Sequence, residues 1–117
     1  MTALAASPHF AEALGVPDTQ IARKWLAWHK ANPQVYELFV RFTLSAINRG
    51  HSKLSAWLII NRIRWETVVE TQGEDFKISN DSIAYYSRLF MYHYPEYAGF
   101  FRIKPLKGQP PTEREEE

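Results

Sequence analysis

Histidine and carboxylate side chains are the groups in this 117-residue chain that could bind a metal ion or transfer a proton. The four histidines are spread widely along the sequence: His9, His29, His51 and His93. None stands four residues from another, so no two of them form a metal-binding pair on one helix. Glu66 and Glu70 share one face of an expected helix, but two carboxylates without a third acid nearby do not hold a divalent cation. These spacings predict neither a catalytic set nor a metal site.

Other catalytic signatures are also missing from the sequence. The chain has no cysteine, which excludes disulfides, thiol catalysis, iron–sulfur clusters and cysteine-type zinc sites. Its five glycines form neither a phosphate-binding loop nor a Gly-x-Ser-x-Gly turn. Asp75 and Lys77, with Asp18 upstream, imitate the acid-x-Lys pair of a nuclease family, but such pairs need adjacent core strands. We therefore expect a protein that is not an enzyme and that carries no metal ion and no cofactor.

Charge is unevenly distributed along the chain. Fourteen Lys and Arg residues stand against 13 Asp and Glu residues, for a net charge of +1. Residues 112–117 hold four of the acids and one of the bases, so the preceding residues carry 13 bases and 9 acids. Their net charge of +4 permits binding to nucleic acid, because phosphate neutralisation provides most non-specific affinity, but does not require it.

Composition predicts one soluble, folded domain. Hydrophobic residues make up 45% of the chain and aromatic residues 15%, which is enough for a packed core at this length. The apolar start, residues 1–6, is short and has no basic residue ahead of it, so we expect neither a signal peptide nor a membrane span. The absence of cysteine fits a reducing cytoplasm.

Apolar residues recur at helical spacing in four segments. The first helix is expected over about residues 18–30, because Asp18 can accept hydrogen bonds from its first backbone amides. The second is expected over residues 33–49, where Asn32 and Pro33 favour a helix start and Gly50 a helix end.

The third segment, capped by Ser52 or Ser55, is apolar almost all round and therefore predicts a helix in the centre of the fold. Its end is open, because residues 68–71 are also compatible with a strand. The fourth helix is expected over residues 80–94, after a run of side chains that favour helix starts.

Residues 76–78 and 100–103 are expected to form two short strands able to pair with each other. The resulting fold class is mainly α, a four-helix domain resembling a helix-turn-helix or winged helix with a rudimentary two-strand β element. The predicted organisation is a flexible arm over residues 1–16, one globular domain over 17–104 and a disordered acidic tail over 105–117.

This order of elements predicts a DNA-binding protein, with residues 80–94 as the recognition helix. The face opposite Ile83, Tyr86 and Phe90 is expected to point outward. Arginine can donate two hydrogen bonds to a guanine edge, whereas lysine and tyrosine contact the phosphate backbone. The predicted DNA-binding residues are Lys77, Asn80, Tyr85, Arg88, Tyr92, Arg102, Lys104 and Lys107.

A second interpretation keeps the helices and assigns a protein partner. Tyr85 and Tyr92 can instead be core residues, and Arg88 can pair with Asp81 or Glu96. Aromatic residues that the core does not bury would form the anchors typical of protein interfaces. The candidates are Trp25, Trp28, Trp57, Tyr92 and Tyr97. This interpretation favours a protein-binding module, and an aromatic face is also compatible with a homodimer.

Five sequence blocks carry a resemblance to a known group. They are Asn-Pro-Gln-Val-Tyr from 32, Arg-Trp-Glu from 64, Phe-Lys-Ile-Ser-Asn from 76, Tyr-Tyr-Ser-Arg-Leu-Phe-Met from 85 and Pro-Glu-Tyr-Ala-Gly-Phe-Phe from 95. Together, over residues 28–103, they resemble a family of small phage and prophage proteins. Ser79 departs from the Lys-Leu-Asn-Asn pattern expected there, although serine also caps helices. The resemblance implies a viral or mobile-element origin and no reaction. With that origin, the partners expected from the two interpretations above are DNA or a host protein, such as a defence protein, in the host cytoplasm.

Overall fold

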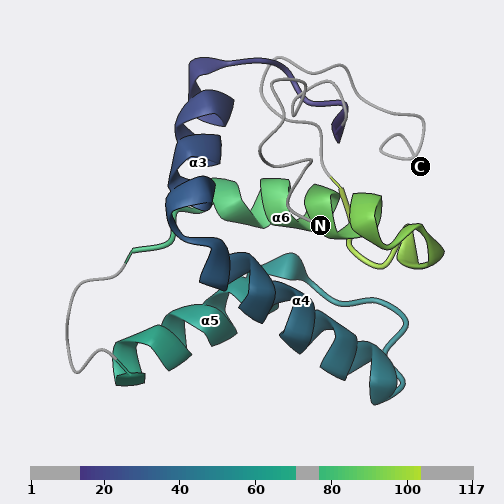
Figure 1. Cartoon of the computed structure of the whole chain (residues 1–117). Coiled ribbons are helices and arrows are strands. Elements are labelled where there is room, and N and C mark those ends of the chain that lie inside the picture. Colours follow the sequence, from purple (N-terminus) through teal and green to yellow (C-terminus); the bar gives the residue numbers. More distant parts are fainter. Residues whose placement is uncertain (1–13, 71–76, 104–117) are drawn as a thin grey trace.

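The computed structural model describes residues 14–70 and 77–103, which form four α-helices and a short 3₁₀ turn and contain no strand. The elements are α3 (Gln20–Ala31), α4 (Pro33–Asn48), α5 (Ala56–Glu70), α6 (Asp81–His93) and η1 (Pro95–Tyr97). In Figure 1, α3 stands above α6 while α4 and α5 diverge below it, so that α6 crosses the middle of the fold. The expected mainly α architecture of four helices is confirmed.

Local signals set most helix ends. Gly50 follows α4 with a φ of +101°, a left-handed backbone conformation that closes the helix as expected. Ser55 caps α5, since its Oγ accepts a hydrogen bond of 3.2 Å from the backbone N–H of Trp57. The segment after Val68 continues as helix to Glu70, so the alternative of a strand there is wrong for the described residues.

The start of α3 differs from the expected one by a cap residue. Thr19 Oγ1, and not the carboxylate of Asp18, accepts a hydrogen bond of 3.1 Å from the backbone N–H of Ala22. Asp18 pairs instead with Arg23, whose guanidinium donates to both carboxylate oxygens at 3.0 and 3.1 Å. Thr19 therefore caps α3, and Asp18 forms a surface ion pair with Arg23 instead.

The two short strands expected over residues 76–78 and 100–103 are not found at residues 77–78 or 100–103. Residue 76 lies outside the described residues. Carbonyl groups of both segments are used by other parts of the chain. The guanidinium of Arg64 donates to the Ile78 carbonyl at 2.6 Å. The Leu54 backbone N–H donates to the Phe100 carbonyl at 3.3 Å. The prediction of a two-strand element is wrong for these described positions because each segment packs against a helix or loop.

The globular domain begins earlier in the chain than residue 17, where it was expected to begin. Leu14 and Val16, expected in a loose arm, pack against the core, and Val16 is buried. Residues 1–13 and 104–117, which include the predicted tail, lie outside the described residues. None of the described helices has the length and apolar character needed to cross a membrane.

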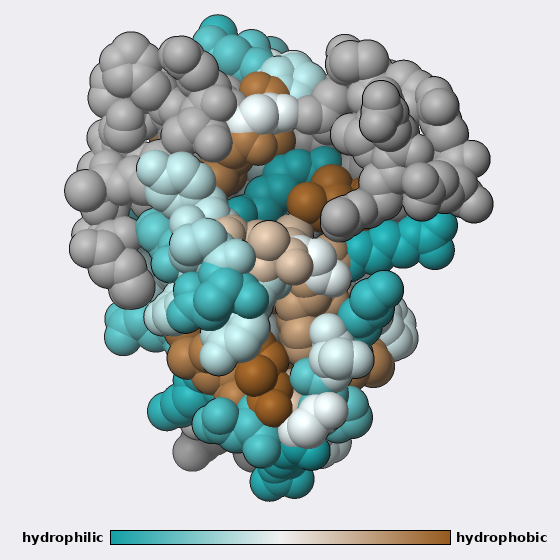
Figure 2. Space-filling model, turned by 90° about the vertical axis from the view of Figure 1, so that its right-hand side faces the viewer, coloured by the Kyte–Doolittle hydropathy of each residue, from teal (hydrophilic) through white to brown (hydrophobic). Residues whose placement is uncertain are grey.

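The core is built around α6. Six consecutive residues, from Tyr85 to Phe90, are buried, which is more than one helical turn and means that α6 is covered on every side. The third helix, α5, was expected in this central position, and that expectation is wrong. Other elements supply fully buried side chains to the same core: Val35, Phe39, Ile60, Ile63 and Phe101. On the side of η1, Figure 2 shows hydrophobic residues down the middle of the face with hydrophilic residues on both sides of them.

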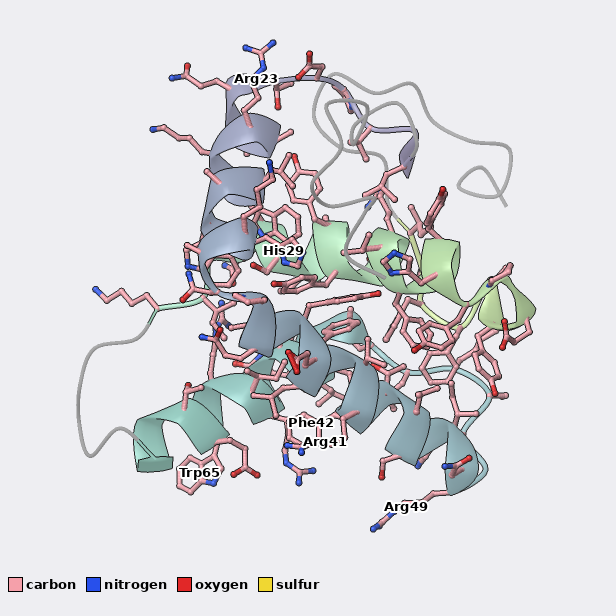
Figure 3. All side chains as sticks on the ribbon, in the orientation of Figure 1. Arg23, His29, Arg41, Phe42, Arg49 and Trp65 are labelled. Atoms are coloured by element: carbon pink, nitrogen blue, oxygen red, sulfur yellow. The ribbon has the colours of Figure 1, made fainter. Side chains whose placement is uncertain are left out.

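Three hydrogen bonds, here called the polar row, connect α3 and α4 to α6. They join Trp25 Nε1 to Ser82 Oγ (2.8 Å), His29 Nδ1 to the Tyr86 hydroxyl (2.9 Å) and the Tyr36 hydroxyl to His93 Nδ1 (2.7 Å). Figure 3 shows His29 projecting from α3 toward α6. Because a buried polar group without a partner costs about 1–3 kcal/mol, these bonds are what allows Ser82 and Tyr86 to be fully buried.

Aromatic rings surround the polar row. The Trp25 indole stacks on His29 with ring centroids 5.1 Å apart and on Tyr85 at 5.0 Å. Tyr36 stacks on Tyr86 at 5.3 Å. These contacts bring together rings from α3, α4 and α6, and such pairs stabilise a core by about 0.5–1.5 kcal/mol beyond the burial of their area.

Burial changes the protonation of His29. Desolvation, with a smaller contribution from the charge of His93, lowers the pKa of His29 to about 4. The folded protein therefore holds a neutral imidazole at pH values where the unfolded chain already binds a proton. Stability from this group is fully present above the ordinary histidine pKa of about 6.5 and is lost as the pH falls toward 4.

We expect the free energy of unfolding to decrease by about 3 kcal/mol between pH 7.5 and pH 4 on account of His29, since one pKa unit corresponds to ~1.4 kcal/mol. Urea unfolding at a series of pH values measures this dependence. His29→Gln should abolish this pH-dependent decrease in the free energy of unfolding. His51→Gln, at an exposed histidine, should leave the decrease unchanged. The same pH dependence in wild type and His29→Gln would contradict a buried neutral imidazole.

Candidate functional site

Two of the predicted DNA-binding residues lie inside the protein. Tyr85 is 4% exposed and Arg88 is 7% exposed, so the expectation that both point outward is wrong. The ring of Tyr85 stacks on Trp25, and burial raises the pKa of its hydroxyl. The guanidinium of Arg88 turns back along α6 and donates to the Ala84 carbonyl at 3.0 Å. The physical reason for the burial of Tyr85 is that Trp25 of α3 packs on its ring, and Arg88 can be buried in part because its guanidinium has a carbonyl partner within α6.

The other predicted residues that the structure describes lie at different places on the molecule. Lys77 lines a small hollow beside Ile21 and Trp28, whereas Arg102 lines a different hollow. Asn80 is exposed, and its Oδ1 accepts a hydrogen bond of 2.8 Å from Arg64. The remaining members are Tyr92, which is half-exposed, and Lys104 and Lys107, which lie outside the described residues.

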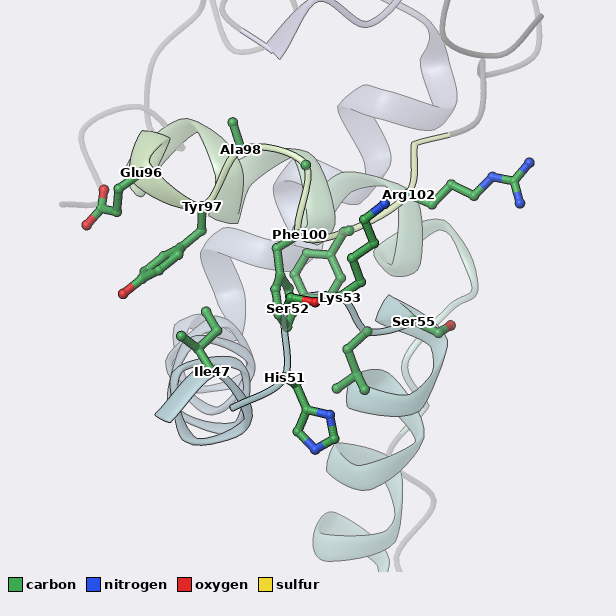
Figure 4. Close-up of a pocket in the computed structure, with 13 residues that line it drawn as sticks. Ile47, His51, Ser52, Lys53, Ser55, Glu96, Tyr97, Ala98, Phe100 and Arg102 are labelled. Carbon is green, nitrogen blue, oxygen red and sulfur yellow. The ribbon is translucent and has the colours of Figure 1, made fainter. Parts of the chain in front are cut away.

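The larger hollow has a volume of about 1100 Å³ and lies between the loop over residues 51–55 and the segment over residues 96–102 (Figure 4). Its histidine and its charged side chains are all exposed: His51, Lys53, Glu96 and Arg102. Figure 4 shows that Arg102 extends away from the other lining residues. Among the described residues, no group of three or more His, Cys, Asp or Glu side chains is placed to hold a metal ion. The hollow therefore lacks the convergent polar groups of a small-molecule site.

The outer side of α5 carries large apolar side chains in solvent. Trp57 is 55% exposed, Leu58 49% and Trp65 68%, and these three residues are here called the α5 face. Leu58 and Trp65 stand seven residues apart and therefore lie almost in line along the helix, and Trp57 lies roughly 80–100° round the helix from them, still on the solvent side. The opposite side is buried in the core through Ala56, Ile59, Ile60 and Ile63. The helix thus has two apolar sides, which explains why its sequence is apolar almost all round.

The area of the α5 face is comparable to the largest apolar patch of an ordinary monomeric protein. A whole tryptophan side chain presents ~250 Å², so the exposed fractions leave about 300 Å² on the two indoles and about 400 Å² with Leu58. The largest apolar patch on a typical monomer measures about 300–600 Å² and is often functional. Tyr92 and Ile21, the other large exposed apolar residues of the described chain, lie on α6 and α3.

Charged groups border the α5 face on the side of α4. The guanidinium of Arg62 lies 4.4 Å from the centre of the Phe42 ring, and that of Arg41 lies 5.7 Å from it. Arg62 Nε also donates to Glu66 Oε1 at 3.2 Å, one helical turn further along α5. Figure 3 shows Trp65, Phe42 and Arg41 along the same lower edge of the molecule. This border therefore combines both signs of charge with an aromatic ring.

Sequence reasoning found only part of this surface. Trp57 was among the candidate anchors, but Leu58, Trp65 and the border residue Arg62 were not. The signal that could have found them is the third helix itself, whose apolar residues occupy two opposite sides. A small domain has room to bury only one of those sides, so the other one must face solvent or a partner.

Comparison of the chain with protein-family models, with curated proteins and with solved structures finds no match. The resemblance to small phage and prophage proteins therefore stays a prediction. The physical character of the α5 face is the observation from which a function can be proposed.

The exposure of Trp65 predicts a small effect on folding. We expect Trp65→Ala to change the free energy of unfolding by no more than about 0.5 kcal/mol, because surface side chains contribute little. Trp25→Ala, at a buried indole bonded to Ser82, should cost about 3–5 kcal/mol. Urea unfolding of both variants tests this contrast, and a cost above about 2 kcal/mol for Trp65→Ala would show that this indole is structural.

Proposed function

We propose that this chain is a non-catalytic protein-binding module whose docking surface is the α5 face. The observation that carries the proposal is the exposure of Trp57, Leu58 and Trp65 on a helix whose opposite side completes the core. Exposing about 400 Å² of apolar surface is unfavourable in water and becomes favourable when a partner covers it.

The residue types support an interface. Tryptophan is the side chain most enriched among residues that dominate binding energy, since it buries a large area with few rotatable bonds. Trp57 and Trp65 stand on a helix that is fixed by Ile59, Ile60 and Ile63 in the core. A surface held in this way loses little conformational entropy on binding, which favours affinity.

DNA binding, the other function expected from the sequence, has weaker support. The helix that was expected to enter a DNA groove lies inside the protein. Four of the seven arginines in the described residues already donate hydrogen bonds within the chain: Arg23, Arg62, Arg64 and Arg88. Guanidinium groups engaged in this way are less available for the phosphate contacts that provide affinity for DNA.

The resemblance to phage and prophage proteins favours a particular class of partner. A protein of that origin acts in the cytoplasm of its host, so we propose a host protein, such as a defence protein, that is inhibited when the α5 face docks on it. The helix order is still compatible with a helix-turn-helix ancestry, in which the former recognition helix has become the centre of the core.

Capture from host lysate on immobilised protein tests the proposed function. Wild type should retain one host protein after nuclease treatment, and Trp57→Ala/Trp65→Ala should lose it while keeping the wild-type circular dichroism spectrum and melting temperature. Ile21→Ala/Tyr92→Ala is the matched control, because it removes two exposed apolar side chains outside the α5 face. Quantitative mass spectrometry compares the three eluates.

Two outcomes would contradict the proposal. One is capture that is equal in wild type and in the double tryptophan variant. The other is capture that disappears with nuclease, combined with duplex DNA binding that weakens steeply between a low and a high salt concentration. That second result would favour DNA binding as the function of the chain.

A further inference from the structure

We infer that the partner of the α5 face is a protein surface that places an acidic side chain beside an apolar patch, and that Arg41 binds this acid. The inference rests on the proposed function and deepens it, because it names the chemistry that the partner must present. It is carried by the arrangement of Arg41, Phe42 and Arg62 on the border of the α5 face.

Arg62 connects this border to the α5 face. It stands four residues after Leu58 and three before Trp65, so these three side chains form one stripe along the solvent side of α5. The Arg62 guanidinium lies 4.4 Å from the centre of the Phe42 ring, which belongs to α4. A partner that covers Leu58 and Trp65 therefore also lies beside the ring of Phe42 and the charges around it.

Two arginines approach this one ring. The guanidinium of Arg41, on α4, lies 5.7 Å from the centre of the Phe42 ring that Arg62 approaches from α5. A guanidinium within about 6 Å of a ring centre is attracted to the ring, which restrains both side chains. The two like charges repel each other, so an additional negative charge at this place is favourable.

Only one of the two guanidinium groups is paired with an acid in the described part of the chain. Arg62 Nε donates to Glu66 Oε1 at 3.2 Å. Arg41 is exposed and turns toward Phe42, and no ion pair joins it to Glu37, the acid one turn earlier on α4. The charge of Arg41 is therefore uncompensated within the border, and an acidic side chain of a partner would neutralise it.

The chemistry of this border favours a carboxylate on a protein. An arginine can donate two parallel hydrogen bonds to a carboxylate, and arginine and tryptophan are the residue types most enriched where binding energy is concentrated. A nucleic acid would need several uncompensated charges in a row, because its affinity grows with the number of phosphates that are neutralised. The border offers the charge of Arg41 next to large apolar side chains, which matches an acid at the rim of an apolar patch.

Selection of random peptides on the immobilised full chain tests the chemistry of the partner. A displayed library of random peptides is first depleted on Trp57→Ala/Trp65→Ala, so that the peptides that remain need the α5 face. We expect the sequences enriched on wild type to combine large apolar residues with Asp or Glu. Enriched sequences without acids, or a selection that yields no sequence dependent on the α5 face, would contradict the inference.

Arg41→Gln tests the assigned residue. Fluorescence polarisation of a labelled selected peptide should show at least ~5-fold weaker binding to Arg41→Gln than to wild type, since an ion pair at the interface is lost. Arg49→Gln is the matched control, because it removes the same charge from an exposed arginine at another place along α4 (Figure 3), and it should leave the affinity unchanged. Equal affinities for wild type and Arg41→Gln would overturn the assignment.

A charge exchange completes the test of Arg41. Arg41→Glu should bind a peptide in which Lys replaces the selected acid more tightly than it binds the original peptide, whereas wild type should show the reverse preference. The same preference in both proteins would mean that Arg41 does not contact the acid. Circular dichroism melting of each variant establishes that it is folded.

The results separate the inference from the proposed function. Capture of a host protein through Trp57 and Trp65 that Arg41→Gln does not weaken retains the function and loses the inference. Acidic peptides that need Arg41, with no host protein retained after nuclease treatment, support the inferred chemistry and contradict the proposed host partner. Duplex DNA binding that Arg41→Gln abolishes, with no acidic peptide selected, would identify phosphate as the anion and overturn the inference.

Discussion

The burial of α6 on every side is the constraint on which the rest of the structure depends. A covered helix is stable only if most of the polar groups that it brings inside find partners. Trp25 and His29 provide these partners for Ser82 and Tyr86, and this requires α3 to lie directly across α6. In the middle turn of α6, the Ser87 hydroxyl and the Arg88 guanidinium both donate to the Ala84 carbonyl, which satisfies part of the hydrogen bonding of these buried groups. The polar row thus determines which helix can be central and how its neighbours cross it.

With α6 in the centre, α5 must occupy the periphery. It contributes one side to the core and anchors the chain before α6, since Arg64 donates both to the Ile78 carbonyl and to Asn80. Its other apolar side is then left in solvent with Trp57 and Trp65. The proposed docking surface is therefore a direct consequence of core packing: one helix has more apolar area than the domain can bury, and that area is available to a partner.

The sequence by itself determined the helices, because caps, glycine stops and apolar spacing act within a few residues. Gly50 and Ser55 did this as expected, and the observed ends of α3, α4 and α6 lie within two residues of the expected ones. Only the tertiary structure decided which apolar helix is inside. Periodicity reports that a side of a helix is apolar but not what covers it, and the partners of Ser82 and Tyr86 come from a helix more than fifty residues away. Sequence reasoning consequently placed α5 in the centre and the arginine of α6 on the surface, whereas in the folded chain α6 is central and its arginine is buried.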